Sequence, residues 1–336
     1  MAAAEPVELA ERSWPFIKMN QSSTDLPQNI KAMLILPDES VLAAAAGSYR
    51  IWQLSADLQK VISVVGNGSY GYDDGAATQA QFIDPSCLVL LPDGRVLLAD
   101  ATGNRLRLLS ANLQQVSTVA QQTQFKDPNG LAVLPDGRVL VADSGNNRIR
   151  VLSADLQQVS TVAGNGEAGY RDGAAADAQF DDPTGLAMLS DGRVLVADRL
   201  NGRIRVLSAD LQKVSTLLIA LLSAAWFAVL SDNQVLVLAD QRVQILDLQT
   251  YKLSKAFHNN TLDNQQTTAI VTRGETVLVA TPSEITQYTY RPDIDQRALS
   301  RLHSTQKSGE ISGEGQLPTE IERKIRKMLS GLRLKM

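Results

Sequence analysis

The chain is poor in the residues that build disulfides and zinc sites. It contains one cysteine, Cys87, and two histidines, His258 and His303. One thiol forms no internal disulfide, and so few thiols and imidazoles argue against a structural zinc site. A lone thiol fits a reducing compartment. No basic segment followed by an apolar core opens the sequence, so we expect an intracellular, cytoplasmic protein; an organelle protein trimmed of its targeting peptide would read the same way.

The sequence also has no large excess of charge of one sign. The 336 residues include 32 Lys and Arg against 36 Asp and Glu, a net charge of −4, which gives no general reason to expect a nucleic-acid partner. The balance is uneven, because residues 319–336 carry +4 and the first 318 residues carry −8. With 44% hydrophobic residues, the composition excludes a disordered or collagen-like chain.

One long uncharged run, 214–231, needs a membrane test. Its 18 residues, VSTLLIALLSAAWFAVLS, approach the length of a spanning helix. Its two ends, however, fall on strand positions of two adjoining repeats, and strands buried on both faces also read as continuous apolar runs. We therefore expect strands here and no integral membrane span.

Internal repeats organise the chain. Three near-copies at 91–120, 134–163 and 189–218 each begin with LxDGRVLxAD, and weaker copies occupy 36–65, 230–257 and 271–294. The turn residues that mark the units are spaced by 55, 43, 55, 41 and 42 residues: Asp38, Asp93, Asp136, Asp191, Asp232 and Gly274. A period of this length is typical of solenoids and propellers.

Each unit predicts four short strands. In the third unit these are GLAVL, RVLVAD, RIRVLS and QVSTVA, with Pro-Asp-Gly between the first two. Proline fixes φ and glycine accepts positive φ, so this tripeptide between apolar runs indicates a hairpin turn. Six sheets of four antiparallel strands can bury their faces only against one another. The sequence therefore predicts an all-β fold, a radial propeller.

The pattern DPxGLAxLxDGRVLVADxxNxRIR, present at 127–150 and again at 182–205, resembles the NHL repeat. The namesake Asn-His-Leu is replaced here by Asn147-Arg148-Ile149. The resemblance covers roughly residues 30–294 and fades in the fifth and sixth units. It implies a six-bladed β-propeller over 30–302, preceded by an N-terminal segment, 1–29.

The sixth unit lacks a clear fourth strand. Two segments are candidates: 14–20, WPFIKMN, from the N-terminal segment, and 298–306, ALSRLHSTQ, which follows directly. We favour the N-terminal strand, because closing the ring with it would hold both ends of the chain and remove exposed sheet edges.

Two matching insertions, GNGSYGYDDGAATQAQF at 66–82 and GNGEAGYRDGAAADAQF at 164–180, explain the longer spacings. Their glycines satisfy G-x-G-x-x-G, the dinucleotide fingerprint. That fingerprint needs a βαβ unit opening into a long helix, whereas this one recurs inside a repeat before a short alanine-rich stretch. We therefore expect tight glycine loops anchored by Phe82 and Phe180, with ligand contact as the weaker alternative, and we assign no cofactor.

Loops between blades gather on one face of a propeller, and function is usually carried by such loops. Tyr70, Tyr72, Tyr170 and Arg171 are of the residue types that anchor protein interfaces, so they are our candidate partner-binding residues. The alternative is that the tyrosines cover a blade edge with their hydroxyls in water.

An aspartate and an arginine recur five residues apart, on either side of the turn after the second strand. Identical pairs at equivalent positions predict structural hairpin ion pairs, worth about 0–1 kcal/mol each if exposed, and not a catalytic constellation. The pairs are Asp100 with Arg105, Asp143 with Arg148, and Asp198 with Arg203.

Two other function classes compete with protein binding. Propeller lactonases hold a metal through carboxylate and amide oxygens near the channel, but this sequence nominates no catalytic or metal-binding residue, and a calcium-type oxygen site stays open. Binding of single-stranded RNA would need a basic face. The repeated arginines partly neighbour aspartates, and stacking aromatics are scarce. These arginines are Arg105, Arg107, Arg148, Arg150, Arg203 and Arg205.

After the propeller, 303–316 reads as a polar linker and 317–336 as a basic amphipathic helix. The helix could bind a protein partner, an anionic surface or RNA, or pack back on its own propeller. Its basic face presents Arg323, Lys324, Arg326 and Lys327. We interpret the whole chain as a non-catalytic interaction or scaffold propeller, a subunit or adaptor of a larger assembly, with a metal-dependent hydrolase and an RNA-binding propeller as alternatives.

Overall fold

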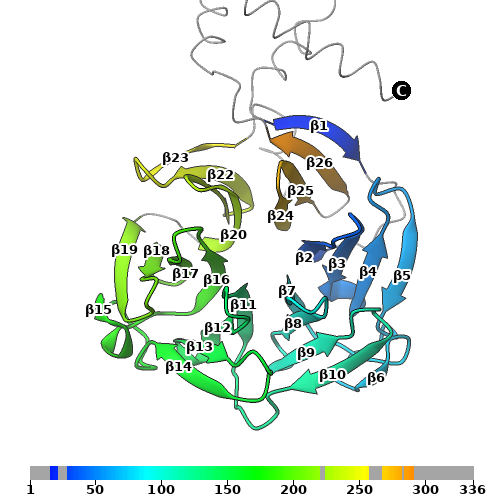
Figure 1. Cartoon of the computed structure of the whole chain (residues 1–336), viewed down its shortest axis with the longest axis horizontal. Coiled ribbons are helices and arrows are strands. Elements are labelled where there is room, and N and C mark those ends of the chain that lie inside the picture. Colours follow the sequence, from blue (N-terminus) through cyan, green and yellow to red (C-terminus); the bar gives the residue numbers. More distant parts are fainter. Residues whose placement is uncertain (1–15, 22–28, 220–223, 257–266, 282–283, 291–336) are drawn as a thin grey trace, which may run out of the picture. The chain divides into compact units, whose positions relative to one another are not determined.

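The computed structural model describes residues 16–21, 29–219, 224–256, 267–281 and 284–290. Within these ranges the regular structure is β-strand apart from three short 3-10 turns: η1 Ala46–Ser48, η2 Ser144–Asn146 and η3 Ala175–Asp177. The strands form six antiparallel sheets, which stand in sequence order around a central axis (Figure 1). The propeller predicted from the repeat count is therefore confirmed, with six blades.

The strands of each blade follow one another from the axis outward. Blades 1 to 3 consist of β2 Ile30–Ile35, β3 Val41–Ala45, β4 Arg50–Leu54 and β5 Val61–Val65; β7 Pro85–Leu90, β8 Val96–Asp100, β9 Arg105–Leu109 and β10 Gln115–Val119; and β11 Pro128–Val133, β12 Val139–Asp143, β13 Arg148–Leu152 and β14 Val159–Ala163. Blades 4 to 6 consist of β16 Pro183–Met188, β17 Val194–Asp198, β18 Arg203–Leu207 and β19 Lys213–Ile219; β20 Ala224–Ser231, β21 Gln234–Ala239, β22 Arg242–Asp247 and β23 Lys252–Lys255; and β24 Ala269–Arg273, β25 Thr276–Ala280 and β26 Ile285–Tyr290 with β1 Phe16–Gln21.

The core lies between the blades. Along β3, Leu42 and Ala44 pack toward blade 2, while Val41 and Ala43 pack toward blade 6. Both faces of the strand are apolar because successive side chains point to opposite faces and each face meets a neighbouring sheet. A single blade would leave both faces in water, so the repeats are stable only as a ring.

The Asp-Gly turns between first and second strands behave as predicted. Gly94, Gly137 and Gly192 have φ between 84° and 86°, a conformation that favours glycine. The aspartate before each glycine accepts a hydrogen bond from the backbone N–H two residues on and pairs with that residue's guanidinium, as Asp93 does with Arg95. Each turn thus stops the first strand and starts the second within a few residues.

The fourth strand of blade 6 comes from the N-terminal part of the chain. β1 pairs antiparallel with β26, from Phe16 opposite Tyr290 to Gln21 opposite Thr286, with one register shift. This is the nearer to the N-terminus of the two candidate segments; the other, 298–306, lies outside the described residues. The innermost strands contact their neighbours all the way round, including β24 against β2, so the ring is closed.

The uncharged run 214–231 contains parts of two strands. It begins within β19 of blade 4 and ends with β20 of blade 5, as expected from the repeat register. The described part of the chain has no helix of the length and hydropathy needed to span a membrane.

The insertions add a fifth strand to every second blade. β6 Gly75–Ala76 lies outside β10 on blade 2, and β15 Gly173–Ala174 lies outside β19 on blade 4. Blades 1–2 and blades 3–4 are therefore two copies of one double-blade unit, in which each insertion position has its equivalent 98 positions later.

Gly130 marks a close approach between blades 3 and 4. A Cβ atom on Gly130 would collide with the carbonyl oxygen of Thr184 and lie 3.0 Å from the Leu186 nitrogen. Both obstacles are backbone, so they cannot rotate away. We expect Gly130→Ala to lower the free energy of unfolding by about 1–3 kcal/mol, as measured by urea denaturation.

Gly47→Ala is the matched control for this substitution. A Cβ on Gly47 would have its nearest contact at 3.4 Å, with the amide nitrogen of the Asn29 side chain. The change should leave stability within about 1 kcal/mol. Equal denaturation midpoints for the two variants would contradict the close approach at Gly130.

Candidate functional site

Each insertion fastens two neighbouring blades together. The first one leaves β5 of blade 1, passes outside β10 as β6, and returns to the start of β7. At its end Phe82 is fully buried in the cluster between blades 1 and 2, and Phe180 occupies the same place between blades 3 and 4. The two phenylalanines act as the predicted anchors.

The second glycine of each insertion lies against an arginine of the preceding blade. Gly68 and Gly166 have φ of +86° and +94°, and a Cβ on either would come within 2.6 Å of the guanidinium of Arg50 or Arg148. These arginines donate hydrogen bonds to the carbonyl oxygens at the start of the loops, at 2.9 Å to Asn67 and 3.0 Å to Asn165. The glycine motif therefore has a structural role: it lets the backbone approach an arginine.

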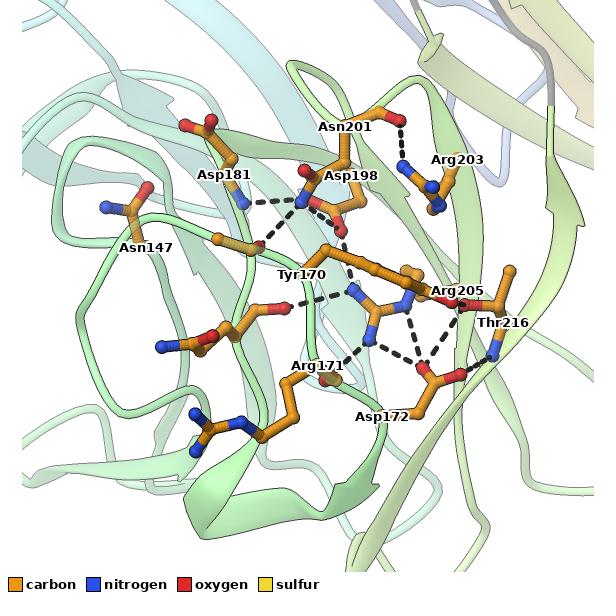
Figure 2. A network of polar contacts seen from close by, with 12 residues as sticks. Asn147, Tyr170, Arg171, Asp172, Asp181, Asp198, Asn201, Arg203, Arg205 and Thr216 are labelled. Atoms are coloured by element: carbon orange, nitrogen blue, oxygen red, sulfur yellow. Dashed lines mark hydrogen bonds and ion pairs between the residues drawn. The ribbon is translucent and has the colours of Figure 1, made fainter.

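The end of the second insertion is held by Arg205, whose side chain is fully buried (Figure 2). Its guanidinium lies 2.6 Å from Asp172 of the insertion and 2.6 Å from Asp198 of β17. It also donates hydrogen bonds to the carbonyl oxygens of Gln179 at 3.0 Å and Arg171 at 2.8 Å. One buried cation thus ties the loop to blade 4 through four oxygen partners.

Blade 2 carries the same arrangement around Arg107, which is also fully buried. The guanidinium lies 2.8 Å from Asp74 and 3.6 Å from Asp100, and donates to the carbonyl oxygens of Gln81 and Asp73 at 2.7 and 2.9 Å. A buried charge costs free energy unless it is paired and hydrogen-bonded, so both arginines depend on their loops.

The predicted aspartate–arginine pairs need correction in their partners. Asp100, Asp143 and Asp198 are each paired with an arginine, but it lies seven residues along instead of five: Arg107, Arg150 and Arg205, at 3.6, 3.3 and 2.6 Å. The carboxylates are fully buried and not exposed at the hairpin.

The partner lies seven residues along, and not five, because each carboxylate points toward the insertion. Asp100 accepts hydrogen bonds from the backbone N–H groups of Ile83 and Asp84 at the end of the insertion, at 3.0 and 2.6 Å. Asp198 accepts one from the N–H of Asp181 at 2.8 Å. The buried arginine of the next strand, Arg107 or Arg205, reaches the carboxylate there. The arginine two residues earlier, which the sequence predicted as the partner, lies at the solvent-exposed edge of the blade, called the rim below.

Burial raises the pKa of the Asp100 and Asp198 carboxyl groups above the ordinary value for aspartate, although the backbone amides and the arginines oppose this change. Because the pKa is higher in the folded state, ionisation of these two groups costs the fold free energy as the pH rises through that pKa. Both groups are part of the network that holds the insertions.

The rim arginines stack on the tyrosines of the insertions. Arg105 lies over the ring of Tyr72 at 3.9 Å, and Arg203 lies over Tyr170 at 4.0 Å. The rings nevertheless present much of their surface to solvent, with exposed fractions of 54% for Tyr72 and 45% for Tyr170. The tyrosines thus cover a blade edge and keep an exposed ring surface.

The other two candidate residues are also exposed. Tyr70 is 64% exposed and meets the ring of Tyr49 edge-on at 5.8 Å. The Arg171 side chain reaches out from the second insertion, away from the buried network (Figure 2). The structure therefore places Tyr70 and Tyr72 on the first insertion, and Tyr170 and Arg171 on the second.

Sequence reasoning missed one exposed apolar residue of this face. Leu200 is 61% exposed, in the turn after β17. The Asn201 side chain donates a hydrogen bond at 2.7 Å to the Gly169 carbonyl oxygen, which fixes this turn against the second insertion. Leu200 replaces the Gly145 of the preceding repeat, and this departure from the repeat was the signal available in the sequence. The basic candidates Arg323, Lys324, Arg326 and Lys327 lie outside the described residues.

The central channel contains a mainly apolar cavity. Its cavity of about 260 Å³ is lined by the six innermost strands, with mainly apolar side chains. Among the described residues that line it, Lys31 carries the only charge and none is Asp, Glu or His; Lys31 is paired with Asp84 at 2.7 Å. Desolvation raises the pKa of the Cys87 thiol to about 12, so this lining residue is protonated at neutral pH. No group of three metal-ligating side chains gathers elsewhere in the described ranges.

These features define a β-propeller whose polar networks hold loops in place. The NHL repeat model matches residues 125–152 and 180–207, in the third and fourth blades. The protein is thus a six-bladed β-propeller with NHL repeats in its third and fourth blades.

Solved structures share the fold at low sequence identity. Virginiamycin B lyase from Staphylococcus aureus has a TM-score of 0.57 and 11% identity, covering 82% of this chain and 98% of that one. A putative gluconolactonase has a TM-score of 0.59 and 14% identity, covering 81% and 92%. U3-55K has a TM-score of 0.57 and 13% identity, covering 80% of each. No curated protein matches the sequence. Enzymes and WD40 proteins thus share this architecture, and the likeness shows the fold alone.

Proposed function

We propose that this propeller is a non-catalytic platform that binds protein partners through the face formed by its two insertions. The observation that carries the proposal is the set of exposed anchoring residues on loops held rigidly from below. Tyrosine and arginine dominate the energetics of protein interfaces, and a rigid loop loses little entropy on binding. The set is Tyr70, Tyr72, Tyr170, Arg171 and Leu200.

The chemistry of the channel supports this proposal over a lactonase-like hydrolase. Metal-dependent hydrolysis needs oxygen ligands and a base around one point. The described channel lining offers apolar side chains and a protonated thiol instead. The carboxylates in the blades are engaged by backbone amides and arginines, as Asp198 is by Arg205.

The positions of the arginines support protein over RNA. Arg107 and Arg205 are fully buried and so cannot meet a phosphate. Arg148 is half-buried and bonded to the Asn165 carbonyl oxygen, and Arg150 pairs with Asp143. Arg105 and Arg203 remain at the rim, too few cations for a face that tracks a nucleic-acid backbone.

Affinity capture from an extract of the source cells tests the proposal. The variant Tyr70→Ser/Tyr72→Ser/Tyr170→Ser/Arg171→Ser should retain its specific co-purifying proteins at least about fivefold less than the wild type, because interface anchors carry most of the binding energy. Quantitative mass spectrometry of the captured material provides the measurement.

The control changes the opposite turns, with Arg95→Ser/Arg138→Ser/Arg193→Ser. These arginines pair with the aspartate two residues before them at the Asp-Gly turns. The control should capture the same proteins as the wild type. If it loses them equally, or if the tyrosine variant keeps them, the insertion face is not the binding face.

A further inference from the structure

A polar cleft lies beside the first insertion and has a volume of about 620 Å³. The insertion, the turn after β8, the end of β10 and the connection from blade 2 to blade 3 form its walls. Volumes of this size are typical of sites that bury a ligand. Tyr72, Asp73, Asn104, Arg105, Thr118 and Gln121 are among the lining residues.

Arg105 is the cation of this cleft, and its donors are unused by the protein. Within the described ranges its side chain makes no hydrogen bond or ion pair, and its guanidinium carbon lies over the Tyr72 ring, 3.9 Å from the ring centroid. A guanidinium presents five N–H donors in a fixed fork that matches a carboxylate. Stacking on the ring holds the fork in one plane, so little entropy is lost when a ligand binds.

The equivalent arginine on blade 4 does have a hydrogen-bond partner in the protein. Arg203 also lies over a tyrosine, Tyr170, but it donates a hydrogen bond at 2.6 Å to the carbonyl oxygen of Asn201 (Figure 2). The turn there reads Arg-Leu-Asn-Gly, whereas the turn before Arg105 reads Ala-Thr-Gly-Asn. The two sites therefore differ in the state of the arginine: Arg203 donates to a carbonyl oxygen of its own turn, whereas the guanidinium of Arg105 has no such partner among the described residues.

The charges around Arg105 favour a single carboxylate over a polyanion. Asp73 and Asp74 line the same cleft. Asp74 is engaged by Arg107 at 2.8 Å and by Thr118, whose N–H and hydroxyl donate at 2.9 and 3.0 Å. A chain of phosphates would meet these carboxylates and the −8 of the first 318 residues, while one carboxylate needs only the arginine.

The remaining wall suits a peptide backbone. Gln121, Thr123 and Gln124 line the cleft with amide and hydroxyl groups, which both donate and accept hydrogen bonds. Phe125, buried and apolar, completes the lining beneath them. Alternating donors and acceptors beside an apolar floor match an extended chain better than a compact metabolite.

We propose that this cleft binds an extended segment of a partner protein through one acidic side chain, which Arg105 receives in a two-pronged ion pair above Tyr72. The inference rests on the proposed function, because it assigns the partner chemistry at one end of the same face. Arg105 supplies specificity for the acid, and Tyr72 orients Arg105.

Pools of immobilised short peptides test the proposal with the full chain. Each pool fixes one central residue as Glu, Asp, Gln, Asn or phosphoserine, with the flanking positions randomised. The wild type should be retained about tenfold more on the Glu and Asp pools than on the Gln and Asn pools, because a charge-assisted pair replaces a neutral contact. Arg105→Gln should abolish this preference, and Arg105→Lys should keep only part of it.

Arg203→Gln is the matched control and should preserve the preference, and thermal melts of each variant confirm folding. Equal retention on all pools, loss of the preference in Arg203→Gln, or stronger retention on phosphoserine or single-stranded RNA would each overturn the inference. Failure here together with intact, tyrosine-dependent capture from the extract would overturn the acidic-peptide assignment alone and leave the proposed function standing.

Discussion

Replacing Arg205 by methionine is expected to lower the free energy of unfolding by about 3–5 kcal/mol, one of the largest effects of any single substitution in this chain. Methionine has nearly the length of arginine, so the change removes the charge and the donors while filling much of the space. It leaves Asp198 fully buried with no cation, and removes the side-chain donor of the carbonyl oxygens of Gln179 and Arg171, which keep only the backbone bonds between these two residues. Chemical denaturation measures the loss.

Arg203→Met is the control, because it changes the same residue type two positions away on the same strand. Arg203 stacks on Tyr170 at the rim, where a cation–π contact is worth about 0.5–1 kcal/mol. Adding Asp198→Asn to Arg205→Met should recover part of the loss, since the asparagine can still accept from the Asp181 N–H without a buried charge. Similar destabilisation by Arg203→Met and Arg205→Met would show that burial of the cation is not what holds the insertion.

Repetition explains how much of the fold could be predicted from the sequence. The strand pattern recurs six times and the Asp-Gly turn three times, so local signals that are ambiguous once become decisive together. The same repetition predicted that 214–231 crosses between two blades. Residues after 290 could be read only from composition, and those expectations stay predictions.

The candidate site was harder to predict, because its partners are decided in three dimensions. Asp198 and Arg203 are nearest in sequence and opposite each other in the ladder, so the sequence favoured that pair. The carboxylate instead turns to a backbone N–H of the insertion, and Arg205 reaches it from within. The repeated Tyr-x-Asp-Gly of the insertions and Arg-x-Arg of the third strands, two copies 98 residues apart, were the available signal for this contact.

The sequence gives only a weak signal that the guanidinium of Arg105 has no partner in the protein. In the sequence it differs from Arg203 in the preceding turn, Thr-Gly-Asn against Leu-Asn-Gly, and in the neighbouring insertion, Asp73 against Arg171. Whether the arginine donates to a carbonyl oxygen of its own turn depends on the backbone conformation of that turn. Both turns contain a residue in the left-handed conformation just before the arginine, Asn104 in one and Gly202 in the other. The different hydrogen bonding of two near-copies is therefore visible only in the three-dimensional structure.

Removing residues 1–21 is expected to lower the melting temperature by about 10 °C. The deletion takes away β1, the outer strand of blade 6, and leaves the outer edge of β26 without its ladder from Phe16 to Gln21. Several backbone hydrogen bonds at about 0.5–1.5 kcal/mol each account for a loss of this size, at about 2–4 °C per kcal/mol. Circular dichroism during heating gives the measurement, and light scattering should report aggregation through the exposed edge.

The control is a shorter deletion, of residues 1–15, which keeps β1 and should melt close to the full chain. A synthetic peptide spanning β1, added to the longer deletion, should raise the melting temperature with a dependence on peptide concentration, because a ligand that binds the native state stabilises it by mass action. If the two deletions melt together, the pairing of β1 with β26 contributes little. Blade 6 would then be stable with three strands, and the ring would be held by the contact of β24 with β2 and by the packing of blades 5 and 6.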